Sequence, residues 1–209
     1  MDNIAGKRQM KRCKENDSDA LDVAAAVLRA GGVVALPTET VYGLTALWRH
    51  QGACQKIYQL KHRPADKRLQ MLAASISVAV AAGLCPDERL ERLGRHFWPG
   101  ALTVVASSQG GDSIGLRIPA HPFLAALLER LGEPLAATSA NASGQPAAIT
   151  ASAAVYGLDG EPDLLIDGGE VSVTAGAAST VVSLLAPEAV ILRQGPISLA
   201  AIQSALAAV

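Results

Sequence analysis

The chain has 209 residues, of which half are hydrophobic and only 3% are aromatic, and its formal net charge is -1 at pH 7. This composition predicts a globular protein of one domain, or one and a half, with a large core of mainly aliphatic side chains. It argues against a protein that binds polyanions over its whole surface or stacks bases on many aromatic rings. Any nucleotide or nucleic acid is therefore expected to bind at a local patch of charge.

The two ends of the chain and its cysteines indicate the cellular compartment in which the protein works. Cys13, Cys54 and Cys85 form no CxxC motif or Cys/His cluster, which indicates free thiols in a reducing compartment. Residues 1–17 are charged and lack periodicity, so we expect a flexible leader before one domain over 18–209. There is no apolar signal segment and no run of roughly 18 apolar residues. We therefore expect a cytoplasmic protein with no membrane partner.

Hydrophobic periodicity predicts interleaved helices and strands along the rest of the chain. In chain order the expected elements are a helix capped at 18–19 and ended at 31–32, a strand over 33–36, a loop over 38–43, a helix over 51–61, a strand over 69–74, a helix over 87–97, strands over 101–106 and 114–118, a helix over 122–131, a strand over 135–137, a helix over 147–156, strands over 164–166, 180–185 and 189–192, and a helix over 198–208. No internal repeat interrupts them. The pattern predicts one α/β or α+β domain with a twisted, mixed sheet.

The loop after the first predicted strand is polar. The strand ends at Pro37, and ligands in open α/β sheets bind at such strand ends. Thr38 or Thr40 can hydrogen-bond a polar ligand there. Glu39 is as well suited to act as a base as to pair with a neighbouring cation.

Cations gather where the helix over 51–61 ends. Pro64 disfavours helical geometry in the residue before it, so we expect Lys61 and Arg63 on a solvated helix end and loop. Four cations lie in the eight residues from Lys61 to Arg68. An Arg fork can hold a phosphate or carboxylate through two hydrogen bonds, and Lys adds a mobile point charge. The cluster predicts a site for an anionic small molecule or, as reasonably, for nucleic-acid phosphates.

A second polar loop, TSANASG at 138–144, follows the strand over 135–137. Small hydroxyl and amide side chains after a strand allow backbone N–H groups to point inward, and such a nest binds phosphate without a cation. An ordinary Ser/Asn-rich turn is the alternative. The chain contains neither GxxxxGK[ST] nor GxGxxG, so a nucleotide would bind by neither common phosphate loop.

Arg117 stands among apolar residues of a predicted strand. A buried charge is costly unless it is paired, so Arg117 is expected to hold an acid, either a protein carboxylate or a ligand carboxylate. Ser179 and Arg193 are further polar groups at strand ends. The histidines have no metal-ligand spacing with any cysteine or acid, so no metal site is predicted.

Seven motifs follow one another along nearly the whole chain. They are PTETVYGL at 37–44, KHRP at 61–64 followed by DK, FWPG-x-LT at 97–103, GLRIP-x-HP at 115–122, TSANASG at 138–144, STVV at 179–182 and LRQG at 192–195. In this order they resemble the YrdC-like family, the threonylcarbamoyl-AMP synthases. The family's phosphate-binding signature, KxR followed by SxN, is matched by Lys61/Arg63 and Ser139/Asn141.

The resemblance implies a single α/β domain in which helices flank a twisted mixed sheet with a concave, basic pocket. It implies that L-threonine, bicarbonate and ATP give L-threonylcarbamoyl-AMP and pyrophosphate, for the N6-threonylcarbamoyl modification of adenosine 37 in tRNA. Mg²⁺ is expected to come with ATP, without a protein cage. tRNA is an expected partner, either directly or through a downstream threonylcarbamoyl transferase complex.

The resemblance also implies a role for each matched residue. Lys61 and Arg63 are the expected catalytic residues, because transfer to phosphorus needs positioning and neutralised oxyanions. The expected ATP- and phosphate-binding residues are Lys61, Arg63, Ser113, Thr138, Ser139, Asn141 and Arg193. The expected L-threonine-binding residues are Thr38, Arg117, which would hold the carboxylate, and Ser179.

The chain departs from the family pattern in several places. Arg68 and Ala101 stand where many members have proline, and Leu72 or a neighbour stands where some have a histidine that touches threonine. The chain also ends soon after LRQG, so we expect no extra C-terminal domain. The group that contacts the threonine side chain is therefore left open.

Two other functions stay open at this point. One is a double-stranded RNA or tRNA-binding module of the same fold without catalysis, which the small net charge and few aromatics disfavour. The other is a relative of carbamoyltransferases that use carbamoyl phosphate, although their additional zinc-finger and acylphosphatase-like parts are missing from this sequence.

Overall fold

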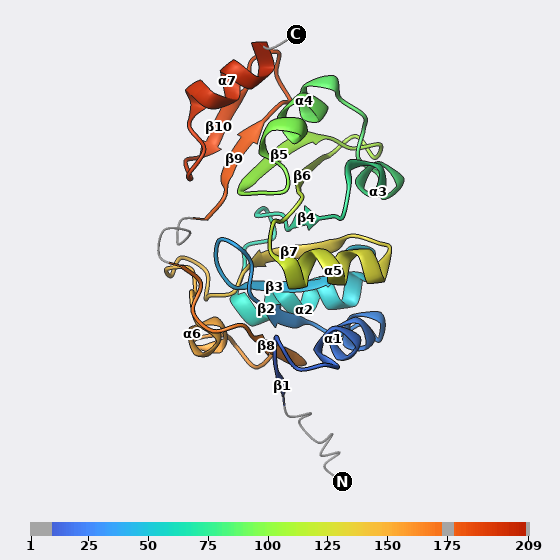
Figure 1. Ribbon diagram of the computed structural model, residues 1–209, viewed down its shortest axis with the longest axis vertical. Helices are drawn as coiled ribbons and strands as arrows, with labels where there is room; N and C mark the ends of the chain where they lie inside the picture. Colours follow the sequence, from blue (N-terminus) through green and yellow to red (C-terminus); the bar gives the residue numbers. More distant parts are fainter. Residues whose placement is uncertain (1–9, 173–177, 208–209) are drawn as a thin grey trace.

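One mixed β-sheet runs through the computed structural model, which describes residues 10–172 and 178–207 (Figure 1). The strands are β1 Lys11–Lys14, β2 Val34–Leu36, β3 Gly43–Leu47, β4 Gln70–Leu72, β5 Leu102–Ser107, β6 Ser113–Arg117, β7 Leu135–Ser139, β8 Leu164–Asp167, β9 Thr180–Ser183 and β10 Val190–Arg193. The helices are α1 Ala20–Arg29, α2 Gln51–Lys61, α3 Ile76–Ala81, α4 Glu88–Phe97, α5 Pro122–Leu131, α6 Ala151–Val155 and α7 Leu199–Ala207. None of the described helices is both long and apolar enough to cross a membrane.

The strand order across the sheet is β1-β8-β2-β3-β7-β4-β6-β5-β9-β10. The pairs β1–β8, β2–β8, β4–β6 and β5–β9 are parallel, and the other neighbouring pairs are antiparallel. This arrangement confirms the predicted mixed sheet. It brings β4, β6 and β7 together at the centre, although they are far apart in the sequence.

The helices cover the two faces of the sheet unequally. On one face, α1 and α5 pack on β8, β2 and β7. On the other face, α2 and α6 pack on β2, β3 and β8, and α3, α4 and α7 pack on β6, β5 and β9. Within the described residues, no helix packs on the first face of β6, β5 and β9. That open face is the floor of the site described below.

Helix α2 shows how the sequence sets the position of the first cation. The His50 side chain caps it by accepting a 3.1 Å hydrogen bond from the backbone N of Ala53. Ile57 and Leu60 lie four and one residues before Lys61, on the same buried stripe. The helix ends at Lys61, and the next residue, His62, has a left-handed backbone (φ 48°) that turns the chain toward Pro64. Lys61 is therefore directed into the molecule.

The predicted leader over 1–17 needs a correction. Lys11–Lys14 forms strand β1, which pairs in parallel with β8 at the edge of the sheet. Only Cys13 of β1 is buried, and its other residues are exposed cations, a common way to protect a sheet edge. A strand of this kind has no apolar alternation, so the sequence pattern did not reveal it. Residues 1–9 lie outside the described residues.

Three other elements differ from the prediction. Strand β3 was missed because every one of its residues is buried and the polar loop before it obscured its start. Helix α3 was missed because its 6 residues are too few to show a helical period. Helix α6 is shorter than predicted, since Thr150 caps it by accepting a hydrogen bond from the backbone N of Ala153. In the last predicted helix, Ala208 lies outside the described residues.

Candidate active site

A cavity of about 260 Å³ lies on the open face of the sheet, over β7, β4, β6, β5 and β9. Residues from the loop after β2, from the loop after α2 and from the start of β9 complete its wall. The lining residues are Thr40, Val41, Arg63, Arg68, Leu69, Gln70, Thr103, Val105, Ser113, Gly115, Arg117, Ala137, Thr138, Ser139, Ala178, Ser179, Val181 and Arg193. Seven of the residues that were expected to bind substrates are among them, and no carboxylate is.

Arg63 is held rigidly at the wall of this cavity. Its Nη1 donates to Thr138 Oγ1 at 3.1 Å, and its Nε and Nη2 donate to the backbone oxygens of Lys67 and Arg68. These acceptors are neutral, so the positive charge keeps its capacity for an anion. Burial lowers the pKa of Arg63 below its ordinary value, as expected for a charge that has lost water.

Arg193 occupies the opposite wall in a similar way. Its guanidinium donates to the backbone oxygen of Ser179 at 2.8 Å and to Ser179 Oγ at 3.0 Å. Burial lowers the pKa of Arg193, and the positive charges of Arg117 and Arg63 lower it further. With Arg68 at the rim, four arginines from distant parts of the chain line one cavity, which suits it to a multiply charged anion.

Arg117 has the acid that its sequence context predicted, and that acid is in the protein. Its Nη2 lies 2.6 Å from Oε1 of Glu39. Both oxygens of Glu39 lack a hydrogen-bond partner among the described residues, so the contact is an ion pair without hydrogen-bond alignment. Both terminal nitrogens of Arg117 donate to Thr40 Oγ1 at 3.0 Å. Arg117 is only 3% exposed, yet it still lines the cavity.

Lys61 differs from the expectation of a solvated side chain. It is 1% exposed, and its Nζ donates to the backbone oxygens of Ser139 and of Asn141, the latter at 2.6 Å. Burial, and then the charge of Arg63, lower the pKa of Lys61 from 10.5 to about 8. Lys61 does not line the cavity but lies behind the loop that does, and it fixes that loop from within.

The predicted backbone nest at 138–144 also needs a correction. The backbone N–H groups of Ala140, Asn141 and Ser143 donate to the backbone oxygens of Tyr42, Ser139 and Lys61, respectively. Thr138 and Ser139 do line the cavity, so this loop presents hydroxyl groups to it. Asn141 does not, because its Nδ2 donates to Ala142 and Gln145 and closes the turn.

Thr38 is placed behind the cavity, and Thr40 lines it instead. Thr38 Oγ1 donates to the backbone oxygen of Val41 at 2.7 Å and accepts from the backbone N of Thr40 at 3.1 Å. These bonds form a tight turn that aims Thr40 at Arg117. Of the two threonines that the sequence offered, the structure brings only Thr40 to the cavity.

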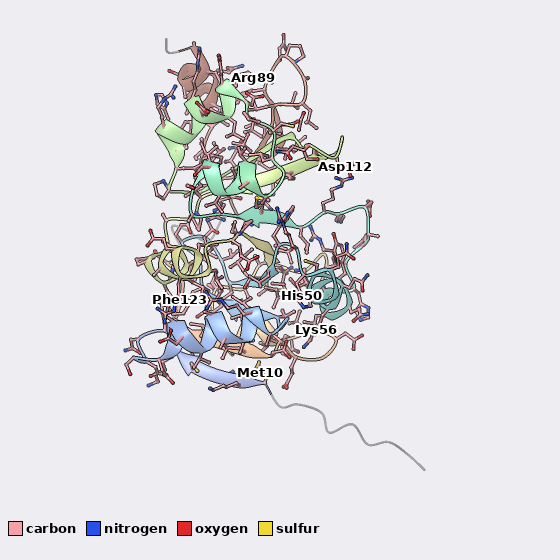
Figure 2. All side chains as sticks on the ribbon, turned by 90° about the vertical axis from the view of Figure 1, so that its right-hand side faces the viewer. Met10, His50, Lys56, Arg89, Asp112 and Phe123 are labelled. Atoms are coloured by element: carbon pink, nitrogen blue, oxygen red, sulfur yellow. The ribbon has the colours of Figure 1, made fainter. Side chains whose placement is uncertain are left out.

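Ser113 is near the rim of the cavity, next to an exposed ion pair. Arg68 Nη2 lies 2.8 Å from Oδ1 of Asp112, which is labelled in Figure 2. This pair raises the pKa of Arg68 and lowers that of Asp112. Exposed pairs of this kind contribute little to stability, so Arg68 and Asp112 form an adaptable edge to the cavity.

Gln70 and Thr103 line the cavity but were not predicted as site residues. Thr103 Oγ1 donates to Gln70 Oε1 at 3.1 Å and lies 2.8 Å from Ser179 Oγ. The signal was the alternation of β4, in which polar Gln70 precedes the buried Met71. That signal is too short to interpret until the register of the sheet is known.

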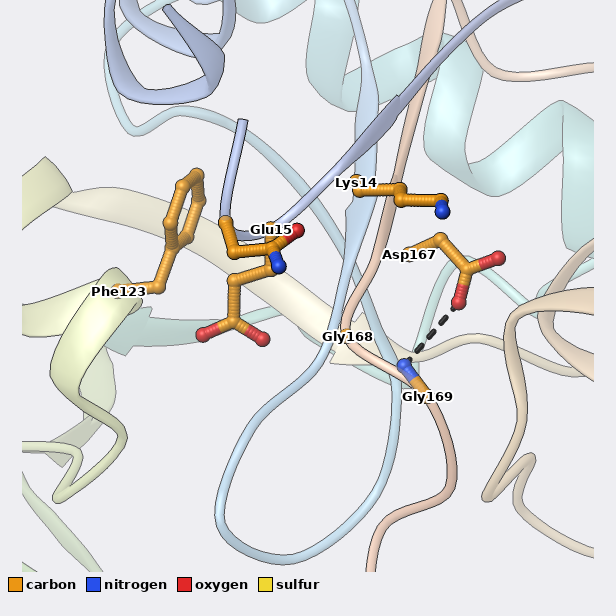
Figure 3. Close-up of a pocket in the computed structure, with 7 residues that line it drawn as sticks. Lys14, Glu15, Phe123, Asp167, Gly168 and Gly169 are labelled. Carbon is orange, nitrogen blue, oxygen red and sulfur yellow. Dashed lines mark hydrogen bonds between the residues drawn. The ribbon is translucent and has the colours of Figure 1, made fainter. Parts of the chain in front are cut away.

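A larger cavity, of about 670 Å³, lies elsewhere, where β1 and β8 end (Figure 3). Its lining includes Glu15, Phe123 and Asp167 but none of the predicted site residues. Asp167 uses Oδ1 to accept from the backbone N of Gly169, as the dashed line in Figure 3 shows. Among the described residues, no three His, Cys, Asp or Glu side chains gather as a metal site. The smaller cavity is the better candidate site, because seven predicted site residues line it.

A family model named Sua5_yciO_yrdC, with the description "Telomere recombination", matches residues 26–195. The chain belongs to this Sua5/YciO/YrdC family. It is 40% identical over 186 residues to threonylcarbamoyl-AMP synthase of Bacillus subtilis (strain 168), a match that covers 84% of this chain and 53% of the relative. It is also 40% identical over 140 residues to threonylcarbamoyl-AMP synthase of Stenotrophomonas maltophilia (strain K279a), covering 61% of this chain and 75% of the relative.

A solved structure agrees with the fold of this Sua5/YciO/YrdC protein. The crystal structure of P. abyssi Sua5 complexed with L-threonine superposes with a TM-score of 0.84 at 34% identity, covering 95% of this chain and 61% of that chain. The predicted family and fold class are thereby confirmed. The chain spans about half the length of several of these relatives, for example 53% of the Bacillus subtilis protein.

Proposed function

We propose that the protein is a threonylcarbamoyl-AMP synthase, which makes L-threonylcarbamoyl-AMP and pyrophosphate from L-threonine, bicarbonate and ATP. The observation that carries the proposal is the cavity that Arg63, Arg117 and Arg193 share and that no described carboxylate lines. Its relatives bear the name of this activity, and P. abyssi Sua5 was crystallised with L-threonine.

The proposed reaction needs charge stabilisation more than acid–base chemistry. The threonine amine and bicarbonate condense to a carbamate and release water. A carbamate oxygen then bonds to the α-phosphorus of ATP while the bond to the β-phosphate oxygen breaks and pyrophosphate leaves. Negative charge builds up on the phosphate oxygens during transfer, and cations fixed around the cavity stabilise it.

The contacts support separate binding roles for the cations. Arg63 and Arg193 are proposed to hold the phosphates and the bicarbonate-derived group, together with the hydroxyls of Ser113, Thr138 and Ser139. Arg117, with Thr40, is proposed to hold the threonine carboxylate, near Ser179. Lys61, Asn141 and Thr38 act from behind by fixing the loops that carry Ser139 and Thr40.

The remaining proposals concern partners. Mg²⁺ would come with ATP and be held by phosphate oxygens and water, since no carboxylate lines the described cavity. The product is chemically an activated acyl adenylate, so a transferase must consume it, and tRNA is the proposed final acceptor. We propose a cytoplasmic location. Binding of double-stranded RNA or tRNA by this protein itself is an alternative role for the cations.

The test is to incubate the purified chain with ATP, bicarbonate and L-threonine and to measure released pyrophosphate. We expect release that requires both threonine and bicarbonate, and a product with the mass of threonylcarbamoyl-AMP. Pyrophosphate release at the same rate with and without threonine would contradict the proposal. Retention of tRNA without any pyrophosphate release would favour the RNA-binding module instead.

A further inference from the structure

Gln70 lies on the floor of the cavity, between two groups of cations and hydroxyls. Its strand β4 pairs with β6 so that Met71 is opposite Leu116 and Leu72 is opposite Arg117. Gln70 is therefore beside Gly115, two residues from Arg117 on the same face of the sheet. Its side chain is only partly buried and lines the cavity. Leu72, by contrast, is 1% exposed in the core below α5.

A chain of hydrogen bonds fixes the orientation of the Gln70 amide. Arg193 can only donate, so Ser179 Oγ accepts from its Nη2 at 3.0 Å. Thr103 Oγ1 has one hydrogen, which it donates to Gln70 Oε1 at 3.1 Å. The 2.8 Å bond between Ser179 and Thr103 must then run from Ser179 to Thr103. With Oε1 of Gln70 as the acceptor at its end, every proton in this relay points toward Gln70.

The opposite end of the Gln70 amide is free to act on a ligand. With Oε1 engaged by Thr103, Nε2 is left with two N–H groups, and no hydrogen bond to a described residue uses them. Gly115 leaves room for this, because a Cβ there would make a tight contact of 3.3 Å with Thr103 Cγ2 and an ordinary contact of 4.0 Å with Gln70 Cβ. Without a side chain at Gly115, the amide spans β6 to reach Thr103 and stays exposed to the cavity.

The position of Gln70 suits the side chain of an amino acid. Arg117 and Gly115 are two residues apart on β6, which corresponds to about 6.6 Å along the strand. An amino acid whose carboxylate contacts Arg117 can therefore direct a β-oxygen to Gln70. Val105 and the methyl group of Thr103 flank Gly115 and offer apolar surface for a methyl group.

We propose that Gln70 Nε2 donates a hydrogen bond to the side-chain hydroxyl of the amino-acid substrate and thereby selects a β-hydroxy amino acid. This inference rests on the proposed synthase function and adds a specificity residue to it. Thr103 is a positioning residue, which acts by holding the Gln70 amide in one orientation. A site that hydrogen-bonds a substrate hydroxyl rejects analogues that lack it, because the donor is left unpaired.

The experiment compares L-threonine with L-2-aminobutyrate, which is threonine without its hydroxyl. Amino-acid-dependent pyrophosphate release gives kcat/KM for each, in the wild type, Gln70→Met and Thr103→Val. We expect Gln70→Met to reduce the preference for threonine by about 10-fold to 100-fold, mainly through weaker use of threonine. Thr103→Val is expected to reduce it less, because Gln70 is still present but free to flip. Gln109→Met, an exposed matched control, is expected to keep the wild-type ratio.

Different outcomes separate this inference from the function on which it rests. If the wild type releases no threonine-dependent pyrophosphate, the proposed function is wrong and the role of Gln70 is rejected with it. If the wild type is active but Gln70→Met and Thr103→Val keep its preference, only the role of Gln70 is wrong. Should Gln70→Met fail to fold, Thr103→Val decides alone, and an unchanged preference rejects the proposal.

Discussion

The guanidinium groups of the cavity are held almost entirely by neutral oxygens. Arg63 donates to a threonine hydroxyl and two backbone oxygens, and Arg193 donates only to Ser179. Arg117 is paired with the carboxylate of Glu39, and Arg68 at the rim is paired with that of Asp112. Neutral acceptors fix a cation in place without cancelling its charge, so the field is available for charge that develops on a substrate. Lys61 serves differently, because its buried ammonium group donates hydrogen bonds to the backbone oxygens of Ser139 and Asn141.

The first prediction concerns Arg63→Lys. A lysine keeps the charge but cannot make the three hydrogen bonds that orient the guanidinium, nor hold an anion through two parallel bonds. We expect kcat for pyrophosphate release to fall by about 10²-fold to 10³-fold, as when an oxyanion donor is lost. Arg95→Lys, on the exposed side of α4, controls for the substitution itself. An unchanged kcat with a raised KM would mean that Arg63 only binds substrate.

The second prediction concerns the pH dependence of stability at Lys61. Its folded-state pKa of about 8 is below the ordinary 10.5, so the unfolded chain binds more protons between these values. Stability must therefore increase as the pH rises through that window, by on the order of 3 kcal/mol at about 1.4 kcal/mol per pKa unit. Lys61→Met should remove this increase.

Urea unfolding of the wild type and Lys61→Met from pH 7 to pH 10 measures the effect. We expect the difference between their free energies of unfolding to change with pH in favour of the wild type. Lys67→Met, an exposed lysine on the following loop, controls for the loss of a surface charge. A difference that stays constant across this range would show that Lys61 titrates like a solvated lysine.

At the scale of elements, strand alternation places the site on one face. On the open face, alternate residues of four strands line the cavity: Gln70, Gly115, Thr103 and Val181. The residue after each of them along the strand is buried on the other face, in the core below α3, α4 and α7: Met71, Leu116, Val104 and Val182. The ends of β6 and β10 then add Arg117 and Arg193, and the loop after α2 adds Arg63. Consequently the elements that bury most apolar surface also determine the geometry of the cavity.

The sequence predicted those parts of the fold and site that follow a local pattern. Helix α2, helix α5 and the mixed sheet were expected. Arg63, Arg117 and Arg193, which the family resemblance named as site residues, line one cavity, and their roles there stay predictions. The sequence did not predict β1, whose cations suit a sheet edge, or the inward direction of Lys61, which depends on the left-handed turn at His62. It missed Gln70 because a side chain joins a site through strand register, and register is not visible in one short segment.

The third prediction tests strand β1. Removing residues 1–14 deletes the strand that pairs with β8 and takes Cys13 from the core, leaving β8 as an exposed edge. We expect a lower Tm and concentration-dependent aggregation relative to a chain that lacks residues 1–9 only. Differential scanning calorimetry and light scattering on both truncated chains provide the comparison. Equal Tm values for the two truncated chains would instead support the flexible leader over 1–17 that the sequence predicted.

At the scale of the whole molecule, the uneven cover of the sheet gives a chain with a net charge of -1 a place for the proposed anionic substrate. Helices cover one face along the whole sheet, but the described helices leave the other face of β6, β5 and β9 open. Positive charge is concentrated there, while acidic residues such as Glu15 and Asp159 lie outside the cavity lining. Local field, and not total charge, then determines what binds.

The last prediction follows from the fact that one cavity holds both ends of the proposed reaction. ATP and L-threonine should each bind more tightly when the other is present, because the first ligand orders side chains that the second also uses. Isothermal titration calorimetry of each ligand, with and without the other, measures this coupling, which must be equal in both directions.

Arg117→Ala should raise the threonine KM with little change in ATP binding, and Arg193→Ala should weaken ATP more than threonine. The reverse order would show that the two ends are assigned the wrong way round. Collapse of stability in Arg117→Ala would show instead that this residue serves mainly to pair with Glu39.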